Sequence, residues 1–314
     1  MEQRTTIQKL WNGMIPIELQ LAAADAIELL ASAVLPDPFQ SFYMLIPRIN
    51  YLPFITGRVK EQWLDPMLEL SGIRTMDDKA IKESDIWLEF NGQPLKWHYP
   101  AGLLYDMLVS NVDGEPLLPW SLTLHVRKFP VGKLIPQPST QLMRDMFMAM
   151  IKEADFIRNG STKRVMDLAK SDQMQLLDGL ERHSFEKYFA IHSIIVPSQD
   201  SKAVTPAKGR STVPKAIPLR FYMLPGKEEQ GAKPDISQFH VSQLPVPLNK
   251  EGGEPTTVAD AFGLCYEIAD TSSSAFVTDC TCLCQGISIP WETPVTWLAD
   301  NLFYADCFLH LVVV

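Results

Sequence analysis

The chain has 314 residues, of which 46% are hydrophobic and 21% are charged, a composition typical of a globular protein. The net charge of −9 argues against nucleic-acid binding that depends on neutralising phosphates. The longest apolar runs are far shorter than the ~20 residues that a membrane-spanning helix needs. Five cysteines, and a start at Met1-Glu2-Gln3-Arg4 without the apolar core of a signal peptide, favour free thiols in a reducing compartment. We therefore expect a cytoplasmic protein.

The first part of the chain alternates in hydropathy, as half-buried strands do. We expect Met14–Leu21 to be a strand, and Pro16 within it suggests an edge strand or a bulge. The other expected elements are a short amphipathic helix at 3–11, a helix at 22–34, a strand at 41–46, a helix at about 51–70, a strand from Ile86, a short helix ending near Val109 and a strand at 120–126. The order strand, strand, helix, strand, strand predicts a ubiquitin-like β-grasp fold, in which a mixed sheet covers one helix.

The pattern changes from a period of 2 to a period of 3.6 between Ser139 and about Pro197. Ser139 is placed to cap a helix, and Gly160 is placed to end it. The apolar stripe expected on this helix is Met143, Phe147, Met150, Ala154 and Ile157. Two further helical runs are expected at about 162–172 and 175–194, so the middle of the chain is predicted to be helical.

The remaining chain repeats the first pattern after a segment rich in Ser, Pro and Lys. We expect strands at 217–224 and 239–248, a helix at 257–268, a strand at Cys280, a short segment at 291–301 and a last strand at 307–314. The sequence thus predicts an α+β protein with two ubiquitin-like β-grasp domains flanking a helix-rich domain. The expected parts are an N-terminal helix with the first ubiquitin-like domain at 1–130, the helix-rich domain at 131–197, a basic linker at 198–215 and the second ubiquitin-like domain at 216–314.

Two stretches share one spacing, which indicates a supersecondary unit that is used twice. Ile86, Leu88 and Phe90 precede Gly92, and a tryptophan and a proline follow five and eight residues after that glycine. Cys280, Cys282 and Cys284 precede Gly286, which is followed by a tryptophan and a proline at the same distances. We also expect the Leu-His pairs in the two closing strands, Leu124-His125 and Leu309-His310, to correspond.

The cysteines invite a metal or a catalytic interpretation, but their pattern favours the core. Alternate residues on one strand have Cα atoms ~6.6 Å apart, so their side chains fan out rather than converge on an ion. The repeat aligns Cys280, Cys282 and Cys284 with core positions, and buried cysteine packs as a small hydrophobic residue. Cys307 and His310, three apart on the expected last strand, would face opposite sides and could not form a nucleophilic pair. We expect no catalytic residue, metal or cofactor, and a cysteine hydrolase is the enzyme alternative.

Lys152 is the residue with the most informative surroundings. At 100° per residue it lies opposite the apolar stripe of its helix, where its neighbours are Met148, Ala149 and Phe156. An exposed amine between apolar side chains suits a lysine that attacks a thioester while a partner docks beside it. The alternative is an ordinary surface lysine beside a second packing face.

Several runs, in order along nearly the whole chain, closely resemble the autophagy protein 5 family. The most specific of them is Pro94-Leu-Lys-Trp-His-Tyr-Pro100. The others are Trp11-Asn-Gly-Met-Ile-Pro16, Pro47-Arg-Ile-Asn-Tyr-Leu52, Leu103-Leu104, Pro119-Trp120, Lys152-Glu-Ala-Asp155, Glu292-Thr-Pro294, Trp297-Leu298 and Phe308-Leu-His310. Segments 22–39 and 113–118 and the cysteine-rich strand depart from what we expect throughout the family.

The resemblance implies both an architecture and a role. That family has two ubiquitin-like domains flanking a helix-rich domain, and its Lys-Glu-Ala-Asp lysine, here Lys152, receives the C-terminal glycine of the ubiquitin-like autophagy protein 12. The conjugate would bind a helix of autophagy protein 16 in an inter-domain groove. Together they would act like an E3 ligase on the E2-like carrier of autophagy protein 8, promoting its transfer to phosphatidylethanolamine for autophagosome formation.

The resemblance also implies peripheral contact with the preautophagosomal structure membrane. Lys202, Lys208, Arg210 and Lys215 of the basic linker would either touch anionic lipid, at ~1 kcal/mol per basic residue, or form a solvated tether. The alternative from another class of protein is an unmodified tandem ubiquitin-like adaptor that binds a helical partner.

Overall fold

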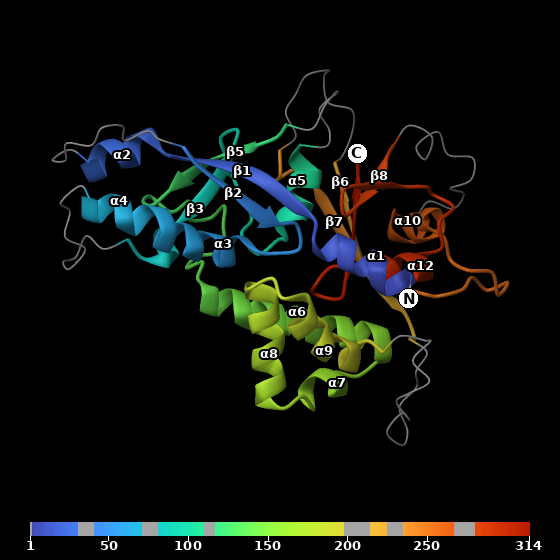
Figure 1. Cartoon of the computed structure of the whole chain (residues 1–314). Helices are drawn as coiled ribbons and strands as arrows, with labels where there is room; N and C mark the ends of the chain where they lie inside the picture. The colour runs from blue at the N-terminus through green and yellow to red at the C-terminus, as the bar shows by residue number, and fades with distance from the viewer. Residues whose placement is uncertain are drawn as a thin grey trace. The chain divides into compact units, whose positions relative to one another are not determined.

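The computed structural model describes residues 2–30, 41–70, 81–109, 117–197, 214–224, 235–266 and 280–314 (Figure 1). The chain divides into two compact units, one made of Gly13–Tyr105 and Val112–Met146 and the other of Met1–Asn12, Asp106–Asn111 and Phe147–Val314. Each unit contains one five-stranded sheet within the described residues.

The sheet of the first unit has the strand order β2-β1-β5-β3-β4. Its central pair, β1 and β5, is parallel, whereas the other neighbouring strands are antiparallel. The strands are β1 Met14–Leu21, β2 Phe42–Pro47, β3 Trp87–Phe90, β4 Gln93–Pro94 and β5 Trp120–His125. The helices that begin in this part of the chain are α2 Ala23–Leu30, α3 Leu52–Val59, the π-helical turn η1 Lys60–Leu64, α4 Asp65–Leu70, the 3-10 turn η2 Glu83–Asp85 and α5 Ala101–Leu108.

The prediction of an edge strand or a bulge from Pro16 is wrong. β1 is paired on both sides, and Pro16 lies in regular register opposite Leu45 of β2. Pairing with β5 begins one residue later, at Ile17 opposite Trp120. Proline is tolerated here because it precedes the doubly paired part of the strand, where a missing N–H would cost a ladder hydrogen bond.

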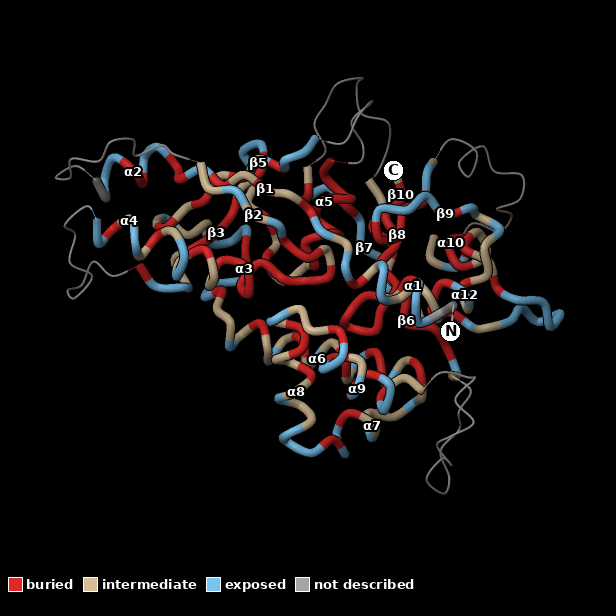
Figure 2. The backbone as a smooth tube through the Cα atoms, in the orientation of Figure 1, coloured by how far each residue is buried: buried red, intermediate tan, exposed pale blue. Residues whose placement is uncertain are grey.

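The sheet of the second unit repeats this topology as β7-β6-β10-β8-β9, with a parallel central pair β6 and β10. All five positions of β10 are buried, as expected for a central strand covered on both faces (Figure 2). The strands are β6 Ile217–Met223, β7 His240–Val246, β8 Cys282–Cys284, β9 Ile287–Ile289 and β10 Leu309–Val313, and the helices are α1 Glu2–Trp11, α10 Val258–Tyr266 and α12 Val295–Asn301. The predicted fold class, two ubiquitin-like domains and a helix-rich domain, is confirmed.

The helix-rich region contains α6 Thr140–Asn159, α7 Lys163–Met166, α8 Lys170–Glu181 and α9 Phe185–Ile195. The predicted boundaries after α6 are wrong, because the two expected runs are three helices. The missed break is at His183, whose φ of 54° ends α8 in the left-handed conformation. At the other break, Asp167 ends α7 and Ala169 begins α8 in an extended conformation.

The internal repeat is confirmed in three dimensions. Each copy turns through two residues of positive φ, Asn91-Gly92 in the first and Gln285-Gly286 in the second. The two equivalent indole N–H groups, of Trp97 and Trp291, each donate to a backbone carbonyl. One supersecondary unit therefore builds the same hairpin and helix in both sheets.

The equivalence of the two Leu-His pairs, in contrast, is wrong. Parallel pairing places Trp120 at the start of β5 and Leu309 at the start of β10, so His310 occupies the position of Ser121. Val314, which exchanges backbone hydrogen bonds with Thr281, occupies the position of His125. The two histidines lie at opposite ends of equivalent strands and have unrelated partners.

The cysteine strand has the buried role that the repeat predicts. Leu88 pairs with Leu124 on β5, and Cys282 pairs with the equivalent Val313 on β10. Cys282 and Cys284 are buried, as predicted. The prediction of a core position for Cys280 is wrong, because this residue precedes the strand and is partly exposed. Burial raises the pKa of the Cys282 thiol to about 12, so this side chain stays neutral.

Candidate functional site

Helix α6 carries Lys152 and is fixed at both ends as expected. The Ser139 hydroxyl accepts a hydrogen bond from the Leu142 N–H at 3.1 Å, which caps the first turn. Gly160 adopts a φ of 70°, and its N–H donates to the Phe156 carbonyl at 2.7 Å. Both predicted helix signals are confirmed.

The buried stripe of α6 differs in part from the predicted one. Its members are Met143, Phe147, Ile151, Ala154, Asp155 and Arg158, so Ile151 takes the place expected for Met150. The last turn was misjudged because Arg158 is buried there, whereas Ile157 is partly exposed. Hydropathy alone does not place an arginine in a core.

Lys152 lies at the border of the exposed face of α6 and is half-buried rather than fully exposed. Ala149, three residues before it, is exposed, and so is Phe156, four residues after it. Phe156 is 59% exposed. Among the described residues, no hydrogen bond or ion pair engages the Lys152 amine. The structure therefore presents this amine beside an accessible aromatic ring.

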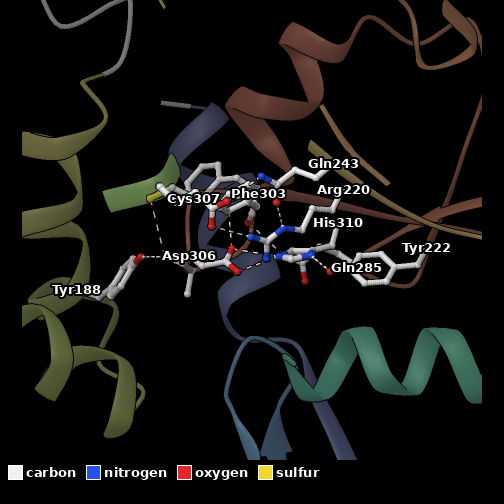
Figure 3. A network of polar contacts seen from close by, with 12 residues as sticks. Tyr188, Arg220, Tyr222, Gln243, Gln285, Phe303, Asp306, Cys307 and His310 are labelled. Carbon is white, nitrogen blue, oxygen red and sulfur yellow. Dashed lines mark hydrogen bonds and ion pairs between the residues drawn. The ribbon is translucent and has the colours of Figure 1, made fainter. Parts of the chain in front are cut away.

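Glu153, the next residue, ties the same helical turn to two strands of the second sheet. Its carboxylate accepts from Arg220 Nη2 at 3.1 Å and from Gln243 Nε2 at 2.8 Å. Arg220 donates from Nε to Gln243 Oε1 (Figure 3). Its guanidinium also stacks over the Phe308 ring, 3.9 Å from the centroid. Glu153 thus holds α6 against β6 and β7.

Ala154 and Asp155 secure the other sides of the turn. Ala154 is in the buried cluster formed with Cys307 and Phe308. Asp155 is 3% exposed, and its carboxylate accepts from the Arg164 and Val165 N–H groups and from Asn159 Nδ2. It therefore caps α7 from a neighbouring helix, so three of the four motif residues hold the backbone in place.

The polar network that contains Arg220 and Gln243 continues into the interior (Figure 3). His310 contacts Tyr222 Oη through Nδ1 at 2.8 Å and Asp306 Oδ2 through Nε2 at 2.9 Å. The Tyr188 hydroxyl donates to the Ala305 carbonyl. Burial opposes ionisation of Asp306, but His310 next to it lowers the pKa of that carboxyl below its usual value.

The structure gives Cys307 no catalytic character. It lies in the turn before β10 with a φ of 67°, not on the strand as the sequence suggested. Burial raises the pKa of its thiol to about 12, whereas a nucleophilic cysteine needs a lowered pKa. Both nitrogens of His310 are engaged by Tyr222 and Asp306, so the structure does not bring Cys307 and His310 together as a reactive pair.

The described residues show neither a metal-binding cluster nor a membrane-spanning helix. Among the described residues, no three or more His, Cys, Asp or Glu side chains are grouped closely enough to hold a metal ion. No helix within the described ranges is long and apolar enough to span a membrane. The contacts of Glu153 and Asp155 were missed from sequence, where only the resemblance singled out their motif.

The fold and this site define a protein with two ubiquitin-like domains joined through a helical bundle that presents a lysine. Family models of autophagy protein 5 match the chain in three parts, the UblA domain at 10–126, the alpha-helical bundle region at 140–198 and the UblB domain at 216–313. The chain belongs to the autophagy protein 5 family, and its role is in autophagy.

Individual relatives agree with this assignment. Autophagy protein 5 of Drosophila melanogaster is 29% identical over 311 residues, covering 99% of this chain and 97% of the relative. Its counterpart in Arabidopsis thaliana is 29% identical with the same coverage, and that in Emericella nidulans is 30% identical over 79% of this chain and 70% of the relative. The crystal structure of Kluyveromyces marxianus Atg5 shares the fold, with a TM-score of 0.68, 23% identity and coverage of 98% of this chain and 99% of that one.

Proposed function

We propose that Lys152 is the acceptor through which this protein is conjugated to the ubiquitin-like autophagy protein 12. The unprotonated amine attacks the thioester carbonyl of the modifier's C-terminal glycine on its carrier. A C–N bond forms, the C–S bond breaks, the carrier thiolate leaves, and the proton released by the attacking nitrogen passes to solvent. The product is an isopeptide.

The observation that carries this proposal is that one side chain of this helical turn has no polar contact among the described residues, while the three residues that follow it are held by neighbouring residues. Hydrogen bonds hold Glu153 and Asp155, and apolar packing holds Ala154. The Lys152 amine makes no hydrogen bond or ion pair with any of the described residues. A turn held from three sides loses little backbone freedom when its lysine reaches the thioester, so the entropic cost of the reaction is limited to ordering the side chain.

The conjugate acts in our proposal as a non-catalytic subunit of an E3-like complex. It binds a helix of autophagy protein 16 and positions the E2-like carrier of autophagy protein 8, so that autophagy protein 8 is transferred to phosphatidylethanolamine. This places the protein peripherally at the preautophagosomal structure membrane. The neutral, buried thiols of Cys282 and Cys307 agree with a role in positioning rather than in covalent catalysis.

The test is peptide mapping of protein purified from its own cells during induced autophagy. We expect a branched, glycine-linked tryptic peptide at Lys152, and loss of both the conjugate and lipidated autophagy protein 8 in Lys152→Arg. The matched control is Lys163→Arg, which changes an exposed lysine of α7 and should leave both unchanged. A branch at another lysine would refute the assignment of the residue. Lipidation that persists in Lys152→Arg would favour the unmodified adaptor instead.

A further inference from the structure

Strand β2 forms one edge of the first sheet, and its composition is unusual for an edge. Its sequence, Phe-Tyr-Met-Leu-Ile-Pro, contains no charged residue, and the side chains of Tyr43 and Leu45 are 62% and 61% exposed. Among the described residues β2 pairs with β1 alone, so alternate N–H and C=O groups on its other side have no strand partner. An exposed apolar edge of this kind is a template for the addition of another strand.

The equivalent edge of the second sheet provides an internal comparison. β7 carries Pro245, which lacks an N–H, and Gln243, whose side chain binds Glu153 and Arg220. A proline is one way in which proteins protect an edge from pairing. β2 has no proline along Phe42–Ile46, although the two strands hold the same place in the repeated topology.

The outer face beside β2 combines apolar side chains with a fixed negative charge. Leu45 lies opposite Pro16 in the ladder, and Tyr43 lies opposite Glu18. The Glu18 carboxylate accepts hydrogen bonds from Ser41, Tyr43, Gln20 and Ser121 at 2.7–3.1 Å, all of them neutral donors. Within the described part of the chain no cation lies within ion-pair distance of this carboxylate.

Those hydrogen bonds keep the charge in place. Donation from Ser41, and then from Ser121, Tyr43 and Gln20, lowers the pKa of Glu18 to about 2, so the side chain is ionised throughout the physiological range. On the inner side of the edge, Phe42 stacks on Trp63 with ring centroids 5.4 Å apart. The fixed negative charge of Glu18 therefore lies on the outer face, on the same side as Tyr43 and Leu45.

We propose that β2 is a docking edge for an extended segment of a partner protein, which adds a strand to the first sheet and carries alternating apolar residues and a Lys or Arg. Backbone groups of the segment pair with the free edge of Phe42–Ile46. Side chains on one face of the segment cover Tyr43 and Leu45, and its cation lies beside Glu18, whose charge makes the edge selective for basic segments over acidic ones. This site is separate from Lys152 and does not depend on its conjugation.

Selection of random linear peptides displayed on phage tests the proposal, with the full chain as bait and a Tyr43→Lys/Leu45→Lys double variant as the subtractive bait. The enriched peptide is then synthesised, and its affinity is measured by fluorescence anisotropy. Leu45→Lys should weaken binding at least about tenfold, because it removes apolar contact and adds a charge of the repelled sign. Glu18→Gln should weaken it about threefold and reduce its dependence on salt.

Two controls separate docking from misfolding. Val241→Lys places the same charge on the protected edge β7 and should bind as the unaltered protein does, and Lys152→Arg should also bind normally. Thermal unfolding must show that the Leu45→Lys protein remains folded. We expect this result because Leu45 is exposed. Hydrogen exchange in the complex should show slower exchange of amides within Phe42–Ile46.

Three results would overturn the proposal. One is the enrichment of peptides that lack the alternating, basic pattern or bind Leu45→Lys equally well. Another is binding without protection of the β2 amides. The third is concentration-dependent self-association of the chain that Leu45→Lys abolishes, which would show that the occupant is a second copy of this protein.

Discussion

Glu153 and Arg220 form an ion pair between α6 and β6, with 3.1 Å between Oε2 and Nη2. Their side chains are 45% and 17% exposed, so solvent weakens the attraction, but Gln243 shares the carboxylate and Phe308 shares the guanidinium. A network of this kind contributes more than an isolated surface pair.

Glu153→Ala should therefore lower the free energy of unfolding by ~1 kcal/mol. The matched control is Glu186→Ala, which removes the largely exposed partner of Arg4, at 74% and 69% exposure, and should cost less than about 0.5 kcal/mol. Urea unfolding of the two variants measures the difference. Equal effects would mean that the Glu153 network adds nothing to the pair.

Asp155→Ala should be much more damaging than Glu153→Ala. It removes a buried carboxylate that caps α7 and leaves two backbone N–H groups and Asn159 without their acceptor. We expect a loss of ~3 kcal/mol, because unsatisfied buried donors cost more than the hydrogen bonds contribute. Asp145→Ala, at an exposed position of the same helix, is the control and should change stability by less than about 0.5 kcal/mol.

Gly179 allows α8 and α9 to approach closely. A Cβ there would lie 2.6 Å from the Tyr188 nitrogen and 2.9 Å from its Cα, so backbone would have to move. Gly179→Ala should destabilise the protein by ~2 kcal/mol, despite the better helix propensity of alanine. Gly252→Ala, where a Cβ meets nothing within 4 Å, should be close to neutral. A stabilised Gly179→Ala protein would contradict the close packing of the two helices.

His192 should make stability depend on pH. Burial, and then the charge of Arg158, lower its pKa from 6.5 to about 3, and its ring stacks on Phe303 with centroids 4.7 Å apart. Between those two pKa values the unfolded chain binds a proton that the folded chain does not, so stability falls as the pH is lowered through this window. From pH 7 to pH 5 the loss attributable to His192 should be ~2 kcal/mol.

The experiment for His192 is urea unfolding at several pH values, comparing the natural protein with His192→Phe, which retains a ring on Phe303. The stability of the variant should fall by ~2 kcal/mol less over this range. Parallel curves for the natural protein and His192→Phe would show that His192 titrates normally.

Pattern alone predicted the repeated fold because hydropathy period, capping residues and the turn glycines all agreed. It misplaced the equivalence of His125 and His310 for a simple reason. The true offset between the two pairs is four residues, and an even shift keeps every side chain on the same face, so hydropathy cannot detect it. The register of each strand against its neighbours shows which residues are equivalent, and the sequence of a single strand does not contain that information.

The site was harder to predict than the fold. The sequence singled out Lys152, but the donors that hold its turn come from Arg164, Arg220 and Gln243, up to 90 residues away. Arg158 was missed because its burial depends on the charges around it, Asp155 among them. Contacts between segments so distant in sequence leave no local signal.

The five cysteine thiols differ in how far they are buried. Cys280 and Cys265 are partly exposed, whereas Cys282, Cys284 and Cys307 are buried. Burial also raises the thiol pKa of Cys282 and Cys307, so both stay neutral. An oxidant reaches an enclosed neutral thiol when the surrounding structure opens. Because oxidation to sulfonic acid is irreversible, this form of Cys307 would accumulate each time the second unit opens in an ageing cell. Oxidation of the partly exposed Cys280 needs no opening, so the ratio of oxidised Cys307 to oxidised Cys280 would report how often the protein had unfolded rather than how much oxidant it had met.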